Sequence, residues 1–173
     1  MTPSSEHAAR LCLVLFVCVM VNWVDSSLAA APSPYPEPSY QVDVQYVFGE
    51  KGMVLTISVT SLLDVPIYID ESSLPWECVH AIDLVAMIPE PAGAVLERLS
   101  PFDDPVALSR LFRPGETLRG VLLLREEFEG IDALHCKSDI LIFWSCQLRV
   151  YGEAPLERKG GWLLIPRHRD PPV

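Results

Sequence analysis

Asparagine is nearly missing from this sequence, because the 173 residues contain only Asn22, which lies in an apolar stretch near the N-terminus. N-glycosylation needs an Asn followed two residues later by Ser or Thr, so the chain has no acceptor beyond residue 22. Lysine is also scarce, whereas arginine and alanine are common. This bias is typical of a GC-rich bacterial genome, for which an exported chain is expected in the periplasm or the medium.

Recognisable catalytic motifs are missing as well. The sequence has no nucleophile elbow, no metalloprotease helix motif and no Cys-x-x-Cys pair, which removes the enzymes that carry these motifs from consideration. Adjacent acids occur at Asp70-Glu71, Asp103-Asp104 and Glu126-Glu127. We interpret them as solvated turns, because neighbouring carboxylates alone satisfy neither glycosidic chemistry nor calcium coordination. We expect a non-enzymatic protein without a cofactor.

Residues 1–30 have the pattern of a removable export signal. Arg10 precedes an unbroken apolar stretch, Leu11–Val21, which with its extension reaches about 14 residues and is shorter than the roughly 20 that span a bilayer. Asp25 ends the apolar run, and small residues then predict cleavage just after one of Ala29–Ala31. Two alternatives remain open, namely lipid attachment at Cys18 and an uncleaved anchor.

The charge of the chain is acidic and unevenly distributed. The formal net charge is −10, which repels phosphate backbones and anionic lipid heads, so we expect no nucleic-acid binding. We also expect no membrane span once the signal is cleaved. Basic residues outnumber acidic ones only in residues 149–173. This segment is interpreted either as a solvated C-terminal segment or as one that docks onto its own domain or a partner.

Alternating apolar and polar residues predict an all-β domain over residues 40–166. A Pro-rich linker, residues 31–39, precedes it, and residues 167–173 form a flexible tail. Asp104-Pro105 supplies an N-cap and a first-turn proline for one short helix over residues 106–112. The predicted strands cover residues 40–48, 53–60, 65–69, 82–88, 94–99, 118–124, 140–150 and 162–165. Seven or eight short strands with one helix predict a sandwich of two antiparallel sheets.

Two segments carry a resemblance to a known family. Val54–Tyr68 reads VLTISVTSLLDVPIY, and Arg113–Gly120 reads RPGETLRG. This strand–turn–Pro–strand unit with a later Pro-Gly-Glu turn resembles exported bacterial immunoglobulin-like domains, among them small proteinase inhibitors. The resemblance spans about two thirds of the mature chain and implies an immunoglobulin-like β-sandwich, but it carries over no inhibitory-loop residue.

Cys78, Cys136 and Cys146 remain after the signal, and three thiols in an oxidising compartment predict one disulfide and one free thiol. Cys146 lies six residues beyond Ile140 on one strand, roughly 20 Å away at ~3.3 Å per residue. A bridge needs Cα atoms within about 7 Å, which disfavours Cys136–Cys146. We predict a Cys78–Cys136 disulfide, with Cys78–Cys146 as the alternative, and a buried Cys146 on the face that carries Trp144.

Histidines accompany two of these cysteines. His80 lies two residues after Cys78, and His135 directly precedes Cys136. If the two loops met, two thiolates and two imidazoles would form a tetrahedral set for zinc or copper. A periplasmic metal-binding protein is therefore the alternative to our main functional hypothesis.

Trp76 and Trp162 lie in turn-rich segments, and tryptophan is enriched at binding hot spots. Together with His80 they form the candidate binding surface, although capping the end of a core is the other role open to both tryptophans. The expected function is that of an exported protein-binding module with a partner in the cell envelope or outside it. Its sharpest version is inhibition of, or immunity to, an extracytoplasmic enzyme or toxin.

Overall fold

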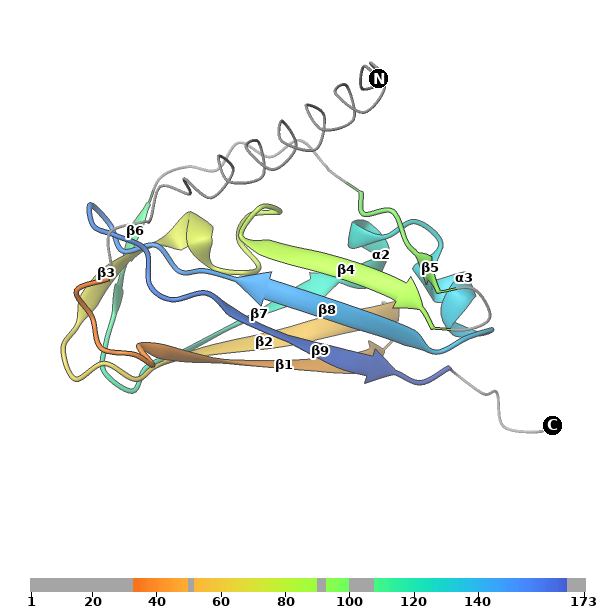
Figure 1. The fold of residues 1–173 in the computed structure, drawn as a ribbon, viewed down its shortest axis with the longest axis horizontal. Helices are drawn as coiled ribbons and strands as arrows, with labels where there is room; N and C mark the ends of the chain where they lie inside the picture. Colours follow the sequence, from red (N-terminus) through yellow and green to blue (C-terminus); the bar gives the residue numbers. More distant parts are fainter. Residues whose placement is uncertain (1–32, 50–51, 90–92, 100–107, 168–173) are drawn as a thin grey trace, which may run out of the picture. The chain divides into compact units, whose positions relative to one another are not determined.

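Antiparallel β-structure dominates the computed structural model, which describes residues 33–49, 52–89, 93–99 and 108–167. The nine strands assigned there are β1 (Tyr40–Gly49), β2 (Gly52–Ser61), β3 (Ile67–Asp70), β4 (Ile82–Ile88), β5 (Ala94–Val95), β6 (Ser109–Phe112), β7 (Thr117–Leu123), β8 (Ile140–Cys146) and β9 (Lys159–Ile165). They form a three-stranded sheet in the order β1-β2-β7, a four-stranded sheet in the order β5-β4-β8-β9, and the pair β3-β6 (Figure 1). The predicted predominance of antiparallel strands is confirmed.

The larger two sheets contribute to one hydrophobic core. In β2 every second side chain, from Met53 to Val59, is fully buried, and the residues between them are half-buried. In β4 and β8 the buried set includes Leu84, Ile140 and Ile142. The period of two that defines a strand pattern therefore places one face of each of these strands in the core.

The end of β1 departs from the predicted alternation. A period of two over the predicted strand 40–48 places Tyr46 and Phe48 on the same face as Tyr40, but they are 38% and 51% exposed, whereas Tyr40 is fully buried. Their partners across the β1–β2 hairpin, Leu55 and Met53, are fully buried, but β1 is the edge strand of its sheet, and its end is less covered than β2. The Phe48 ring instead lies 5.5 Å from the ring of His135, centroid to centroid.

The helix predicted over residues 106–112 is wrong in its described part. Residues 109–112 form β6, which pairs with β3 and places Phe112, 1% exposed, in the core. Tertiary pairing has overridden a local helix signal here, and the N-cap at Asp104 lies outside the described residues. The predicted signal segment, residues 1–30, also lies outside them, as do residues 168–173 of the tail.

Two small helices follow β7, in a segment for which the sequence predicts no helix. They are α2 (Leu124–Glu127) and α3 (Ile131–His135), and a 3₁₀ turn, η1 (Glu71–Ser73), follows β3. Leu124, Phe128 and Ile131 are fully buried in this segment. Their spacing of four and three residues is a helical spacing that the acidic residues between them concealed. Among the described residues, no helix is long and apolar enough to cross a bilayer.

A polar cluster fastens the start of β1 to the segment before β9. The Ser39 amide donates to Glu157 Oε1 at 2.7 Å, and the Tyr40 hydroxyl donates to the Glu157 carbonyl at 2.8 Å. Lys159 Nζ lies 2.8 Å from the same Glu157 oxygen and 5.4 Å from the centre of the Tyr40 ring. The C-terminal end of the predicted linker is thus tied into the domain.

This cluster predicts a loss of stability in acid. Burial alone would raise the pKa of Glu157, but the hydrogen bonds from Lys159 and the Ser39 amide outweigh it and hold that pKa below its usual value. A carboxylate with a lowered folded pKa stabilises the protein above its ordinary pKa and loses this contribution as the pH falls through the folded value. We expect the urea midpoint to fall between about pH 5 and pH 3, and to fall less in Glu157→Gln. Equal pH dependence in the two proteins would contradict this assignment.

Candidate functional site

The outward side of the four-stranded sheet carries a row of exposed apolar side chains. Val85 on β4, Phe143 on β8 and Trp162 on β9 lie directly opposite one another across the three strands. They are 45%, 42% and 65% exposed, respectively. Residues opposite each other on one side of a sheet have neighbouring side chains, so these three form a continuous strip.

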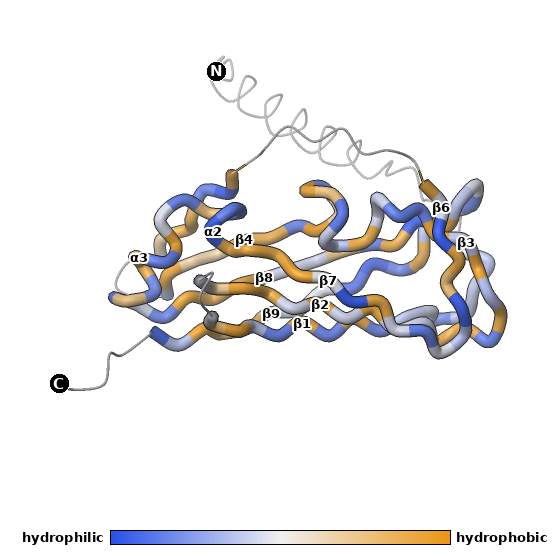
Figure 2. Tube along the Cα trace, turned by 180° about the vertical axis from the view of Figure 1, so that it is seen from behind, coloured by the Kyte–Doolittle hydropathy of each residue, from blue (hydrophilic) through white to orange (hydrophobic). Residues whose placement is uncertain are grey.

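A second apolar row lies beside the first. Val95, Met87, Leu141 and Leu164 are in register across β5, β4, β8 and β9. Val95 is 65% and Leu164 45% exposed, while Met87 and Leu141 are half-buried. We name the seven residues of the two rows the outer face. The hydrophobic colour along most of β4 in Figure 2 reflects this arrangement, since both sides of the strand are apolar.

The outward side of the three-stranded sheet provides a contrast. Asp43, Ser58 and Arg119 are in register there across β1, β2 and β7, whereas apolar residues, Val47, Val54 and Leu123, form a row only near the β1–β2 turn. An antiparallel sheet with one face on the core usually presents such polar residues to water on the other. The outer face of the four-stranded sheet departs from this rule, and contiguous exposed apolar surface commonly marks an interaction site.

The three residues predicted as one binding surface occupy three different places. Trp162 lies on the outer face. Trp76 is half-buried against Gly120 of β7, where an added Cβ would collide with Cγ and Cδ2 of the indole, so Trp76 covers the core, which was the other role open to it. His80 is exposed and lines a pocket described below.

Phe143 and Val85, which complete the strip, were not identified as site residues from the sequence. The signal for them was present in Ile140–Trp144, which is apolar on both sides of the strand. A strand with only one buried side would alternate, so an uninterrupted apolar run indicates that both faces meet apolar surroundings.

The predicted Cys78–Cys136 disulfide is wrong, because the three cysteines of the described residues are all unbonded. Cys78 and Cys136 each precede a strand by four residues, but these strands, β4 and β8, are antiparallel, with Ile82 opposite Cys146. The two cysteines therefore lie at opposite ends of the strand pair, roughly 20 Å apart at ~3.3 Å per residue. Cys146 is buried, as predicted, and burial raises its pKa to about 11.

The same geometry separates the proposed metal ligands. Cys78 and His80 lie at one end of β4, whereas His135 and Cys136 lie beside the start of β8 at the other end. His135 Nε2 is 2.8 Å from the Pro166 carbonyl oxygen. No group of three or more metal-binding side chains occurs among the described residues, so the convergence that a Cys/His metal site would need is not observed.

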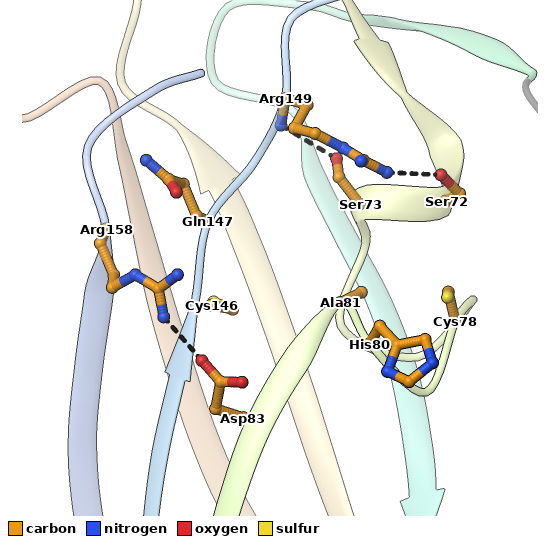
Figure 3. A pocket seen from close by; sticks show the side chains of 10 residues that line it. All are labelled: Ser72, Ser73, Cys78, His80, Ala81, Asp83, Cys146, Gln147, Arg149 and Arg158. Carbon is orange, nitrogen blue, oxygen red and sulfur yellow. Dashed lines mark hydrogen bonds and ion pairs between the residues drawn. The ribbon is translucent and has the colours of Figure 1, made fainter. Parts of the chain in front are cut away.

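A polar pocket opens between η1, the start of β4 and the end of β8 (Figure 3). Its volume is about 390 Å³. Arg149 lies along one wall, and Arg158 faces Asp83 on another. The lining residues are Ser72, Ser73, Cys78, His80, Ala81, Asp83, Cys146, Gln147, Arg149 and Arg158.

Each arginine of the pocket is held by a partner. Arg149 Nη2 donates to Ser72 Oγ at 2.9 Å and to Asp70 Oδ2 at 3.0 Å. Arg158 Nη1 donates to Asp83 Oδ2 at 2.6 Å, and this bond holds the pKa of Asp83 below its usual value. Both arginine side chains are 57% exposed, so solvent screens the two ion pairs and leaves them weak.

Acidic pairs interpreted as solvated turns have structural roles at two places. The Asp70 side chain caps η1 by accepting from the Ser72 amide at 3.0 Å. Glu127, 8% exposed, pairs with Arg98 at 2.8 Å, and Arg98 also donates to the carbonyls of Ile82 and Val79 at 2.7 and 2.9 Å. The interpretation as a solvated turn is therefore wrong for Glu127.

No protein-family model matches the chain, and no curated protein matches it. The outer face and the polar pocket are thus the two features from which function is inferred.

Proposed function

We propose that this chain is a non-enzymatic binding module that recognises another protein through the outer face. The observation that carries the proposal is the strip formed by Val85, Phe143 and Trp162, with Trp162 the most exposed of the three. Trp is among the residues most enriched at energetic hot spots, which usually sit at the centre of an apolar patch. The second row extends the patch over all four strands of the sheet.

The charge of the chain defines the kind of partner. With a net charge of −10, two copies repel each other, and so do this chain and an anionic membrane or nucleic acid. A partner with an apolar patch set in a basic surface is complementary in both respects, since charge would speed the encounter and apolar burial would hold the complex.

We further propose that the domain is an exported immunoglobulin-like β-sandwich. Support comes from the signal-like pattern of residues 1–30, from the turn chemistry of Val54–Tyr68 and Arg113–Gly120, and from two antiparallel sheets with a common core. In that setting the partner is a protein of the cell envelope or the exterior. Inhibition of, or immunity to, an extracytoplasmic enzyme or toxin is the sharpest version of this function.

Trp162→Ser is expected to weaken partner binding at least about thirtyfold, because truncation of a hot-spot residue costs about 2 kcal/mol or more. The partner is first captured from envelope and culture fractions, and its affinity for the purified chain is then measured by calorimetry. Val121→Ser is the matched control, since Val121 is 58% exposed on the outward side of the three-stranded sheet.

Three results would contradict the proposal. These are unchanged affinity in Trp162→Ser, an equal loss in both variants, and a partner without basic surface. Sedimentation of the chain alone completes the test, because a dimer abolished by Trp162→Ser would assign the outer face to a second copy instead.

A further inference from the structure

The pocket of Figure 3 contains two guanidinium groups whose hydrogen-bonding capacity is only partly used. Arg149 donates through Nη2 to Ser72 Oγ and Asp70 Oδ2. Arg158 donates through Nη1 to Asp83 Oδ2 and Ser145 Oγ. Within the described part of the chain, Nε and the remaining Nη of both arginines contact no acceptor. A guanidinium presents five N–H donors in a planar fork. Arg158 retains Nε and Nη2, an adjacent pair that matches a carboxylate, whereas Arg149 retains Nε and Nη1, which point to opposite sides and can each donate one bond.

Other side chains of the pocket add to this capacity. Gln147 and the exposed His80 supply further polar groups, while Ala81 and the buried Cys146 supply apolar surface. The volume of about 390 Å³ lies in the range of small-molecule sites, which combine apolar surface with a few polar groups that fix orientation. The pocket therefore has the size and the chemistry to hold a small polar molecule.

The charges at the pocket balance although the chain as a whole is acidic, because Arg149 is paired with Asp70 and Arg158 with Asp83. Its lining includes Arg149, Arg158 and one carboxylate, Asp83, in a protein whose net charge is −10. Both arginines come from residues 149–173, the segment in which basic residues prevail. Packing of this segment against β4 and η1 thus offsets the charges of Asp70 and Asp83 at one place on an acidic chain.

We infer that this pocket binds a carboxylate group, carried by a small organic acid or by the C-terminus of a peptide. The planar carboxylate fits the unused Nε and Nη2 donors of Arg158 through two parallel hydrogen bonds, and Arg149 can add a further one. A phosphate dianion would bring a second negative charge close to Asp83, which disfavours it. This site is independent of the outer face and of the partner proposed for it.

The test is a titration of the full chain followed by amide chemical shifts in NMR. The probes are lactate, N-acetylated trialanine with a free C-terminus, and the same peptide amidated, each at constant ionic strength adjusted with chloride. Lactate or the free peptide, or both, should shift the amides of Ser73, His80 and Arg149. The amidated peptide should not shift them, and inorganic phosphate should bind more weakly.

Two variants assign the binding to the arginines. Arg149→Gln and Arg158→Gln should each lower the affinity about tenfold or more, the usual effect of losing a charge-assisted hydrogen bond. Arg119→Gln, on the polar side of the three-stranded sheet, should leave it unchanged, and far-UV circular dichroism verifies that all variants are folded. Binding of neither carboxylate probe, equal binding of the amidated peptide, or unchanged affinity in both pocket variants would overturn the inference.

Discussion

Gly120→Ala is expected to destabilise the folded protein by about 2–3 kcal/mol, the usual range for overpacking a filled site. Gly120 faces the indole of Trp76, and a Cβ at this position would overlap its Cγ and Cδ2. Trp76 is half-buried and packs against the core, so its indole must move away from β7 to make room for the added methyl group. Urea unfolding followed by far-UV circular dichroism measures the loss, and Trp76 fluorescence should move to longer wavelength.

A double-mutant cycle isolates this contact from other effects. In a Trp76→Ala background, Gly120→Ala should cost close to nothing, because the colliding ring is gone and alanine restricts the unfolded chain. The coupling between the two sites should therefore exceed about 1.5 kcal/mol. Additive effects of the two substitutions would show that Trp76 does not determine the need for glycine.

Arg98→Met is expected to cost about 3 kcal/mol, or about 10 °C in Tm. Arg98 joins three segments, because it bonds Glu127 after β7 and the carbonyls of Val79 and Ile82 at the start of β4. The two side chains of the ion pair are only 20% and 11% exposed. Removal of the guanidinium leaves the Glu127 carboxylate poorly solvated and removes the hydrogen bonds to the Val79 and Ile82 carbonyls, which is why the cost exceeds that of a surface pair.

Two comparison variants test this reasoning. Arg98→Met with Glu127→Leu should recover part of the lost stability, because an apolar pair needs no compensation for desolvated charge. Arg119→Met removes an exposed arginine and should change the free energy of unfolding by less than about 0.5 kcal/mol. If Arg98→Met also stays within that limit, the network does not hold these segments together.

The strands could be predicted because their signal is local. Met53 to Val59 alternate with polar residues, and a period of two fixes both the strand and its buried side. The helices could not be predicted in the same way, since α2 and α3 are only four and five residues long. Elements this short draw their stability from tertiary packing rather than from propensity.

The outer face could not be predicted as a whole, because the sequence pattern does not show which residues of different strands lie opposite one another. Trp162 was identified from its residue type alone, but its neighbours Phe143 and Val85 required the register of β9, β8 and β4. The disulfide prediction failed for the same reason. Cys78 and Cys136 occupy equivalent positions before their strands, and only the antiparallel pairing of these strands shows that the two thiols are far apart.

The pocket was equally invisible in the sequence. Arg149 and Arg158 were seen only as part of a basic segment, for which a solvated tail and a docked tail were both open. The structure places this part of the segment against the domain, where Arg149 reaches η1 and Arg158 reaches β4. The partners of these arginines, Asp70 and Asp83, lie more than seventy residues earlier in the chain.

The most direct test of the binding proposal is a photo-crosslinking residue placed at position 162, compared with the same residue at position 121. Both sites are exposed, at 65% and 58%, and they lie on the outward sides of different sheets. In envelope and culture fractions, position 162 should give one discrete adduct with a basic protein, and position 121 should give none. Equal labelling from both positions, or no adduct from position 162, would contradict the assignment of the outer face as the binding surface.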